Sequence, residues 1–324
     1  MRITHMSDIH GDFETLDTAL AHVVKEGTDV LAITGDLIGP VFDSKIAVNS
    51  NGNTEQITYA NALEALAQVR PKILQQTQGK ISTYHDIAQA LTNNSSNAPL
   101  ELKAFASQYL ASEELASKRA SEQYSKIGLR LADLPNGIEV VLIPGNWDMK
   151  QITENKILRP SYIHKTSKDV KGVRFAGYGS SLGIPYEERP IDLTIPFNSD
   201  DYSDFLLGLD SPEQSPEIVL LHSGPRFKTP YGFSGEEYAG NAYLAGAKNP
   251  PALMLIGHMH NFGIIREPNS GTVISSSGNV GRFPNHNFGT FSEVELDDNL
   301  YVTSITPKKV DGKDVKVFDK IQVQ

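Results

Sequence analysis

Residues 1–36 of the chain read MRITHMSDIHGDFETLDTALAHVVKEGTDVLAITGD. The apolar runs at 2–6 and 30–34 predict two buried strands. Between them, an apolar face predicts a helix over residues 13–25, which Gly27 ends. The stretch therefore predicts a strand–helix–strand unit in which Asp8 and His10 follow the first strand and Asp36 follows the second.

Three later motifs stand in the same relation to an apolar run. Gly145-Asn146-Trp147-Asp148 follows the run at 139–143, His222 follows the run at 217–221, and Gly257-His258-Met259-His260 follows the run at 252–256. In an open α/β fold, chemistry takes place beyond the carboxyl ends of the strands. We therefore expect these polar side chains to converge on one patch.

The converging residues offer only oxygen and nitrogen ligands, because the chain has no cysteine. Seven such ligands are too many for one zinc ion, which takes four. They suit two divalent ions about 3.5–4 Å apart, and Mn²⁺, Fe and Zn²⁺ all accept such a set. The predicted ligands are Asp8, His10, Asp36, Asn146, His222, His258 and His260.

The order Asp-x-His, Gly-Asp, Gly-Asn-x-Asp, His, Gly-His-x-His resembles that of the calcineurin-like metallophosphoesterases. The resemblance covers roughly residues 1–40 and 137–300. It implies an α/β fold (α+β in some schemes), a four-layer α/β/β/α sandwich of two packed mixed sheets flanked by helices. It also implies a single domain over residues 1–324, with residues 41–135 as a helical insertion.

The resemblance also implies how the ligands divide. Asp8, His10 and His260 would hold one ion, Asn146, His222 and His258 the other, and Asp36 would bridge both. A hydroxide between the ions would attack a phosphate ester, with a phosphodiester as the expected substrate. The candidate catalytic residues are then Asp36, Asn146, Trp147 and Asp148, the last either supporting the Trp147 loop or capping the following turn.

Trp147 is a departure from the family pattern. The family usually has a His here, which contacts the phosphate and can protonate the leaving oxygen, whereas an indole N–H donates without titrating near neutral pH. Loss of such a general acid typically costs about 10²–10⁴-fold in rate. Two other functions therefore stay open: a binding or scaffold protein on the same fold, as at least one relative without this His is, and a nucleotide sensor without turnover.

Composition limits the partners. The chain has 324 residues, 39% of them apolar, and a formal net charge of −10, so a long nucleic-acid duplex is expected to be repelled. A small phosphate ester such as a nucleotide is the expected substrate. The chain has no apolar run near 18–20 residues, which predicts no membrane span, and its first residues lack a signal peptide's apolar stretch, so a cytoplasmic location is expected.

Residues 41–135 exceed what the family needs between its second and third motifs. A polar loop is expected at residues 49–53, followed by two to four helices, one of them interrupted near Pro71. The insertion is predicted to be a cap over the metal site or a homodimer interface, with ordinary packing on the domain edge as the alternative.

The last third of the chain carries further signals. Four runs after His260 predict a second antiparallel layer. Residues 226–248 are expected to form a loop whose aromatic residues either stack a nucleobase or pack as a satellite cluster. Arg282 is a candidate phosphate contact or a surface ion pair, and His286 is a weaker candidate for the site.

Overall fold

The protein is described here by a computed structural model, which divides into two compact units. The first unit contains residues 1–39, 123–182 and 195–324, and the second contains residues 40–122 and 183–194. The described residues are 1–39, 41, 46–50, 53–57, 59–93, 96–181, 192–211, 215–229, 232–234, 238–282 and 288–318.

The first unit contains two six-stranded mixed sheets. The first sheet has the strand order β16 (Asp314–Val317), β15 (Val302–Asp311), β14 (Gly289–Leu296), β1 (Arg2–Met6), β2 (Val30–Thr34) and β5 (Glu139–Ile143). Strands β1, β2 and β5 run parallel, so the carboxyl ends of all three lie at the same edge. Strand β14 lies antiparallel beside β1.

The second sheet has the strand order β12 (Phe262–Arg266), β13 (Val273–Ser277), β11 (Leu253–Ile256), β8 (Ile218–Leu221), β7 (Val173–Tyr178) and β6 (Thr166–Val170). Its four inner strands are parallel, and the edge strands β12 and β6 are antiparallel. This topology again brings several carboxyl ends to one edge.

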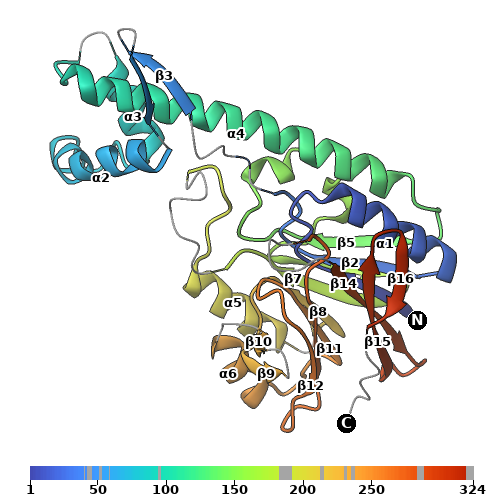
Figure 1. Cartoon of the computed structure of the whole chain (residues 1–324). Coiled ribbons are helices and arrows are strands. Elements are labelled where there is room, and N and C mark those ends of the chain that lie inside the picture. The colour runs from blue at the N-terminus through green and yellow to red at the C-terminus, as the bar shows by residue number, and fades with distance from the viewer. Residues whose placement is uncertain are drawn as a thin grey trace. The chain divides into compact units, whose positions relative to one another are not determined.

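Apolar side chains from both sheets form the core between them, including Ile3 and Val141 of the first sheet and Phe175 and Leu220 of the second. Helix α1 (Phe13–Glu26) lies along the first sheet, near β15 and β16. Helices α5 (Ser199–Leu209) and α6 (Tyr238–Gly246) lie on the outer face of the second sheet, against which they bury Leu206 and Leu244, respectively. The predicted four-layer sandwich is confirmed (Figure 1).

Local interactions at both ends of α1 also stabilise the strand–helix–strand unit. Asp12 caps α1 by accepting a hydrogen bond from Thr15 N, and Gly27 ends the helix at φ 75°, a conformation that favours glycine. Leu16 and Val23 turn inward from the helix and are fully buried. The five strands predicted before the motifs are present with the expected bounds to within one residue.

Phe175 offers a test of the inter-sheet core, because its ring is completely buried there. Phe175→Ala is expected to lower the free energy of unfolding by about 3–5 kcal/mol, from lost burial and the cavity left behind. Denaturant unfolding would measure it, with Leu207→Ala at a 70% exposed position as the control. A loss of less than about 1 kcal/mol, typical of surface positions, would contradict the core described here.

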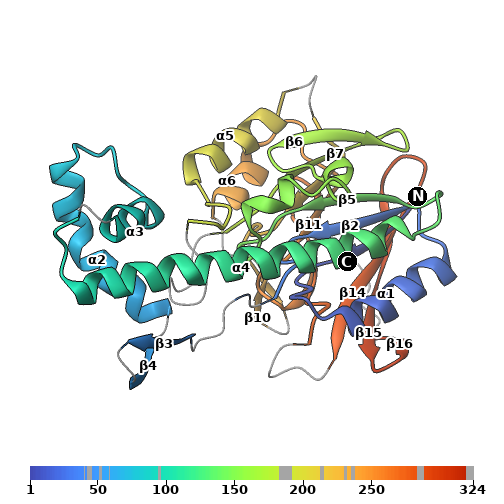
Figure 2. The ribbon, with the colours of Figure 1, turned by 90° about the horizontal axis from the view of Figure 1, so that it is seen from above.

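The second unit is mainly helical. It contains a hairpin of β3 (Ile46–Ser50) and β4 (Asn53–Ile57), helices α2 (Tyr59–Gln76) and α3 (Tyr84–Thr92), and most of α4 (Leu100–Ala132). Leu66, Ile87 and Tyr109 meet in its apolar cluster. Helix α4 is a single helix of 33 residues that continues into the first unit at Gln123 (Figure 2).

Two details of this segment differ from the prediction. The expected polar loop at 49–53 contains the ends of β3 and β4, whose Asn49 and Thr54 pair across the hairpin. Helix α2 continues through Pro71 although proline removes one helical hydrogen bond, since Leu66 and Ile73 on either side pack against the same cluster. Whether the insertion acts as a cap or a dimer interface stays a prediction.

The last third of the chain also differs from the arrangement predicted from the sequence. The predicted second antiparallel layer is wrong: β12 and β13 extend the second sheet, while β14, β15 and β16 extend the first. An apolar run in the sequence shows which side chains share a face of a strand but not which strand pairs with it. The sequence therefore did not assign these strands to the two sheets.

The expected loop at 226–248 contains β9 (Phe227–Thr229), β10 (Gly232–Ser234) and α6. Phe227 and Tyr243 are buried against the second sheet.

The remaining elements are two short 3₁₀ helices, η1 (Lys150–Thr153) and η2 (Arg159–Ser161). Among the described residues, no helix combines the length and the apolar character that crossing a membrane requires. The cytoplasmic location stays a prediction from the sequence.

Candidate metal centre

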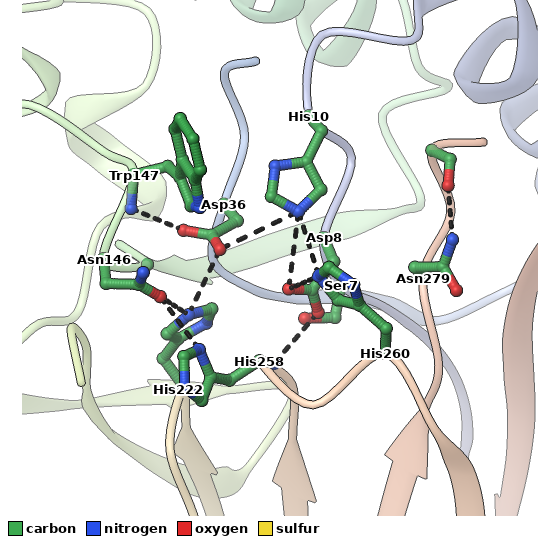
Figure 3. Close-up of polar contacts among 12 residues, drawn as sticks. Ser7, Asp8, His10, Asp36, Asn146, Trp147, His222, His258, His260 and Asn279 are labelled. Atoms are coloured by element: carbon green, nitrogen blue, oxygen red, sulfur yellow. Dashed lines mark hydrogen bonds and ion pairs between the residues drawn. The ribbon is translucent and has the colours of Figure 1, made fainter. Parts of the chain in front are cut away.

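The carboxyl ends of β1, β2, β5, β8 and β11 meet, and the seven predicted ligands lie together there (Figure 3). They come from positions as far apart in sequence as Asp8 and His260. The loops that follow parallel strands bring them together, as the sequence predicted.

One group consists of Asp8, His10 and His260, whose nearest ligand atoms all lie within 4.8 Å of one another. His10 Nε2 lies 3.1 Å from His260 Nε2, and His260 Nε2 lies 3.3 Å from Asp8 Oδ1. These distances join three side chains around a space of the size that one cation needs.

A second group consists of Asp36, His222 and His258, again with ligand atoms within 4.8 Å of one another. His222 Nε2 lies 3.4 Å from Asp36 Oδ2. Asn146 Oδ1 lies 2.6 Å from His222 Nε2 and 3.0 Å from His258 Nδ1, so the amide oxygen faces the same space. Asp36 Oδ2 also lies 3.9 Å from His10 Nε2, which puts this carboxylate between the two groups.

Hydrogen bonds orient the side chains of both groups. His222 Nδ1 donates to the carbonyl oxygen of Thr34 at 2.6 Å, which turns Nε2 toward Asp36 and Asn146. Asp8 Oδ2 accepts from the backbone N–H of His258 at 3.0 Å, leaving Oδ1 to face His260. His222 and Asp8 are thus each oriented by a hydrogen bond to the side-chain atom that does not face the other candidate ligands.

The two carboxylates carry buried charge. Asp8 and Asp36 are almost fully shielded from solvent. Burial opposes ionisation, yet His260 beside Asp8 and His222 beside Asp36 hold the pKa of each carboxyl below its usual range. Against the cost of its own burial, the carboxylates in turn raise the pKa of His222 to about 9. Buried negative charge of this kind requires cations nearby.

The backbone at the site is strained. Asp8, His10, Asp36, His258 and His260 all have positive φ, between 48° and 71°. This left-handed region costs a residue with a side chain roughly 1–2 kcal/mol, and such strain clusters at functional sites. The surrounding hydrogen bonds hold these five residues in a conformation that aims their side chains inward.

Two glycines make the close approach of the loops possible. A Cβ on Gly35, which has φ 95°, would lie 2.5 Å from Gly145 N and 2.7 Å from His222 Nδ1. A Cβ on Gly145 would meet the Asp36 carboxylate, 2.6 Å from its Cγ. Any side chain at either position would push the Asp36 and Asn146 loops apart.

Trp147 lies at the edge of the site and is partly exposed. Its backbone N–H donates to Asp36 Oδ1 at 2.8 Å. Its indole ring stands edge-on to the His10 imidazole, with ring centroids 6.0 Å apart (Figure 3). The indole therefore forms a flat wall beside the two groups, at the position where the resemblance implies a His.

Asp148 is buried and connects two loops. Its Oδ2 accepts from Gly145 N at 2.7 Å, and its two oxygens accept from Leu37 N at 3.2 and 3.3 Å. The following 3₁₀ helix, η1, starts at Lys150, and its N-cap residue is Met149, which makes no side-chain cap hydrogen bond. Of the two roles considered for Asp148, supporting the loops fits the contacts and capping does not. Burial, with the charge of Asp36, raises the pKa of Asp148 to about 6.

The remaining residues considered for the site are Arg282, His286 and Ser181. Arg282 binds Asp12 and Glu14 through its guanidinium, at 2.9 Å and 2.8 Å, which matches the surface ion pair rather than a phosphate contact. His286 lies outside the described residues. Ser181, after β7, was given no role from the sequence, yet its Oγ lies 3.3 Å from His258 Nε2. The signal that could have found it is its position just beyond β7, like that of the candidate ligands beyond their strands.

Comparisons with known proteins bear on the family and on the fold. Residues 1–70 match the family model described as calcineurin-like phosphoesterase, so the resemblance read from the motifs is confirmed. A comparison with curated proteins finds no match.

One solved structure is similar with a TM-score of 0.53 at 12% identity, covering 98% of this chain and 99% of the other. The protein TT1561 of Thermus thermophilus has a TM-score of 0.47 at 15% identity, covering 99% of each chain. A putative 5'-nucleotidase from Staphylococcus aureus has a TM-score of 0.45 at 10% identity, covering 99% of this chain and 56% of the other. At 12% identity, the first of these likenesses shows the fold alone.

Proposed function

We propose that the protein is a metal-dependent phosphoesterase. Its motifs resemble those of the calcineurin-like phosphoesterases, and its residues 1–70 match the model of that family. The observation that carries the proposal is the pair of ligand groups, Asp8 with His10 and His260, and Asp36 with His222 and His258. Asp36 of the second group also faces His10 of the first. A two-metal hydrolase needs two such groups joined by one carboxylate.

The residues fit two divalent ions. Asp8 and Asp36 bring two buried negative charges, and the buried Oδ1 of Asp8 accepts no hydrogen bond from the described residues. Carboxylate, imidazole and amide oxygens suit Mn²⁺, Fe or Zn²⁺. We propose that Asp8, His10 and His260 hold one ion and that Asn146, His222 and His258 hold the other, with Asp36 between them. Bound there, the ions would supply Lewis acidity toward phosphate oxygens and water.

The chain's own residues then orient and shield the reacting groups. Thr34 holds the His222 ring by accepting its Nδ1 hydrogen, and His258 N–H holds Asp8. Trp147, which is partly exposed, and His260, whose side chain is 23% exposed, mark the side on which a substrate would enter. We propose that the Trp147 indole N–H donates to a phosphate oxygen, a role that needs no titration.

The leaving group decides which ester is turned over best. Trp147 has no proton to give near neutral pH, so a leaving oxygen must be stable as an anion or take a proton from water or from the substrate. We therefore propose a small phosphodiester with a good leaving group, such as an activated nucleotide derivative, as the preferred substrate class.

The test is turnover of an activated aryl phosphodiester by Mn²⁺-loaded protein. We expect release of the aryl alcohol that requires the metal and disappears after chelation and dialysis. Metal content measured on the dialysed and reloaded protein should approach two ions per chain. Protein that retains no metal, or that is loaded and inert toward a panel of mono- and diesters, would contradict the proposed hydrolase.

One observation favours a second function. The family's general acid position is occupied by Trp147, so a binding or scaffold protein on the same fold is the alternative. Such a protein would bind metal and ligand without releasing product. Calorimetric binding of a nucleotide to metal-loaded protein, followed by analysis for intact ligand, separates the two functions.

A further inference from the structure

Two successive residues of α4 contact the loops of the candidate metal centre. Gly39 N donates to Gln123 Oε1 at 2.9 Å. The Tyr124 hydroxyl donates to Asp148 Oδ1 at 3.1 Å and accepts from Met149 N at 2.7 Å. Both residues belong to the part of α4 that lies in the first unit.

The Asp148 carboxylate passes this contact on to the backbone beside two candidate ligands. It accepts from Leu37 N, directly after Asp36, and from Gly145 N, directly before Asn146. A single phenol is therefore linked through one carboxylate to the loops after β2 and after β5. These two loops carry the candidate bridging carboxylate and the amide ligand.

The Tyr124 side chain is suited to a fixed role. It is 1% exposed, and its hydroxyl uses both its donor and its acceptor capacity in the bonds described. Burial, with the charge of Asp148, raises the pKa of Tyr124 well above 10, so the phenol stays a donor over the working pH range.

The loop that it supports requires support. Asp36 has φ 51°, and a strained residue keeps such a conformation only where its surroundings impose it. Gln123 adds a second contact three residues farther along the same loop, at Gly39. Helix α4 thus constrains the Asp36 loop at both Leu37 and Gly39.

We propose that Tyr124, together with Gln123, is a positioning residue for the metal centre, holding the Asp36 and Asn146 loops at the spacing that ion binding requires. The inference rests on the proposed function for its consequence but not for its geometry. Neither residue belongs to a motif of the resemblance, since both lie in the segment that the resemblance does not cover.

The first measurement is the Mn²⁺ dissociation constant of Tyr124→Phe. We expect binding about 10- to 100-fold weaker than in the wild type, the usual effect of losing a group that orients metal ligands. Tyr109→Phe is the matched control, because Tyr109 is also buried on α4 and donates to an aspartate, Asp192, at 3.1 Å. Its Mn²⁺ binding should equal that of the wild type, although it loses a comparable hydrogen bond.

The second measurement needs no metal. Hydrogen–deuterium exchange of metal-free protein should be faster in residues 35–39 and 144–149 of Tyr124→Phe than in the wild type or in Tyr109→Phe. Gln123→Ala, at a half-buried position that tolerates truncation, should show faster exchange at 37–39 and a smaller loss of Mn²⁺ affinity. This variant decides the proposal if Tyr124→Phe does not fold.

The outcomes separate the two claims. Wild-type protein that binds no Mn²⁺ contradicts the proposed function, and the exchange experiment then decides the positioning role alone. Faster exchange confined to the two loops supports it. Unchanged exchange in the loops, unchanged Mn²⁺ affinity in Tyr124→Phe with a metal-binding wild type, or equal losses in Tyr109→Phe would each overturn it.

Discussion

Asp36→Asn is expected to abolish turnover of an activated aryl phosphodiester. Asp36 lies between the two ligand groups, with Oδ2 3.4 Å from His222 Nε2 and 3.9 Å from His10 Nε2. An asparagine keeps the size and the Oδ1 acceptor for Trp147 N, but it removes the negative charge that two cations would share. We expect a loss larger than the 10- to 100-fold that removing a mere supporting group typically costs.

The measurement is initial rate together with metal content after dialysis. Asp17→Asn serves as the control, since Asp17 is about half exposed and forms a surface ion pair on α1 with Arg130. It should leave both readouts unchanged. Asp36→Asn protein that is folded, retains two ions and turns over like the wild type would remove Asp36 from the bridging role.

Trp147→His is expected to raise turnover of esters with poor leaving groups by on the order of 10²-fold or more, the range of general acid catalysis. The imidazole would stand where the indole now faces His10 and could donate a proton to the departing oxygen. Activated aryl esters should gain little, because their leaving groups need no proton. The expected signature is therefore a weaker dependence of rate on the pKa of the leaving group.

Trp147→Phe is the matched variant, because it keeps an aromatic wall and removes the N–H. It should lower turnover of all esters alike if the indole N–H holds a phosphate oxygen. A Trp147→His enzyme with the same leaving-group dependence as the wild type would show that position 147 does not face the leaving group.

The candidate site was readable from the sequence because each candidate ligand lies in the short loop that follows a buried strand. Residues such as Asp8 and His222 need only the local rule that parallel strands end at one edge. The orienting contacts were not readable in this way. Tyr124 and Thr34 join the site through hydrogen bonds that depend on tertiary packing, and neither position has a local pattern that distinguishes it from a core residue.

The fold was predicted less evenly. The alternation of strand and helix over residues 1–36 specified its own pairing, because a short helical connection favours parallel neighbours. The runs after His260 have no helical connections that would indicate their partner strands. Strand β14 pairs with β1, which lies at the opposite end of the sequence. In the second unit, α2 passes through Pro71 because apolar burial outweighs the local cost, a balance that propensity alone does not give.

The left-handed backbone of the five candidate ligands sets stability against function at these positions. Glycine adopts that conformation without the penalty of roughly 1–2 kcal/mol that a side chain incurs there, so Asp8, His10, Asp36, His258 and His260 are positions where a glycine would relax the chain. A glycine at any one of them would relieve this backbone penalty but would also remove a candidate cation ligand, and at Asp8 or Asp36 it would remove the acceptor of the His258 or Trp147 backbone N–H.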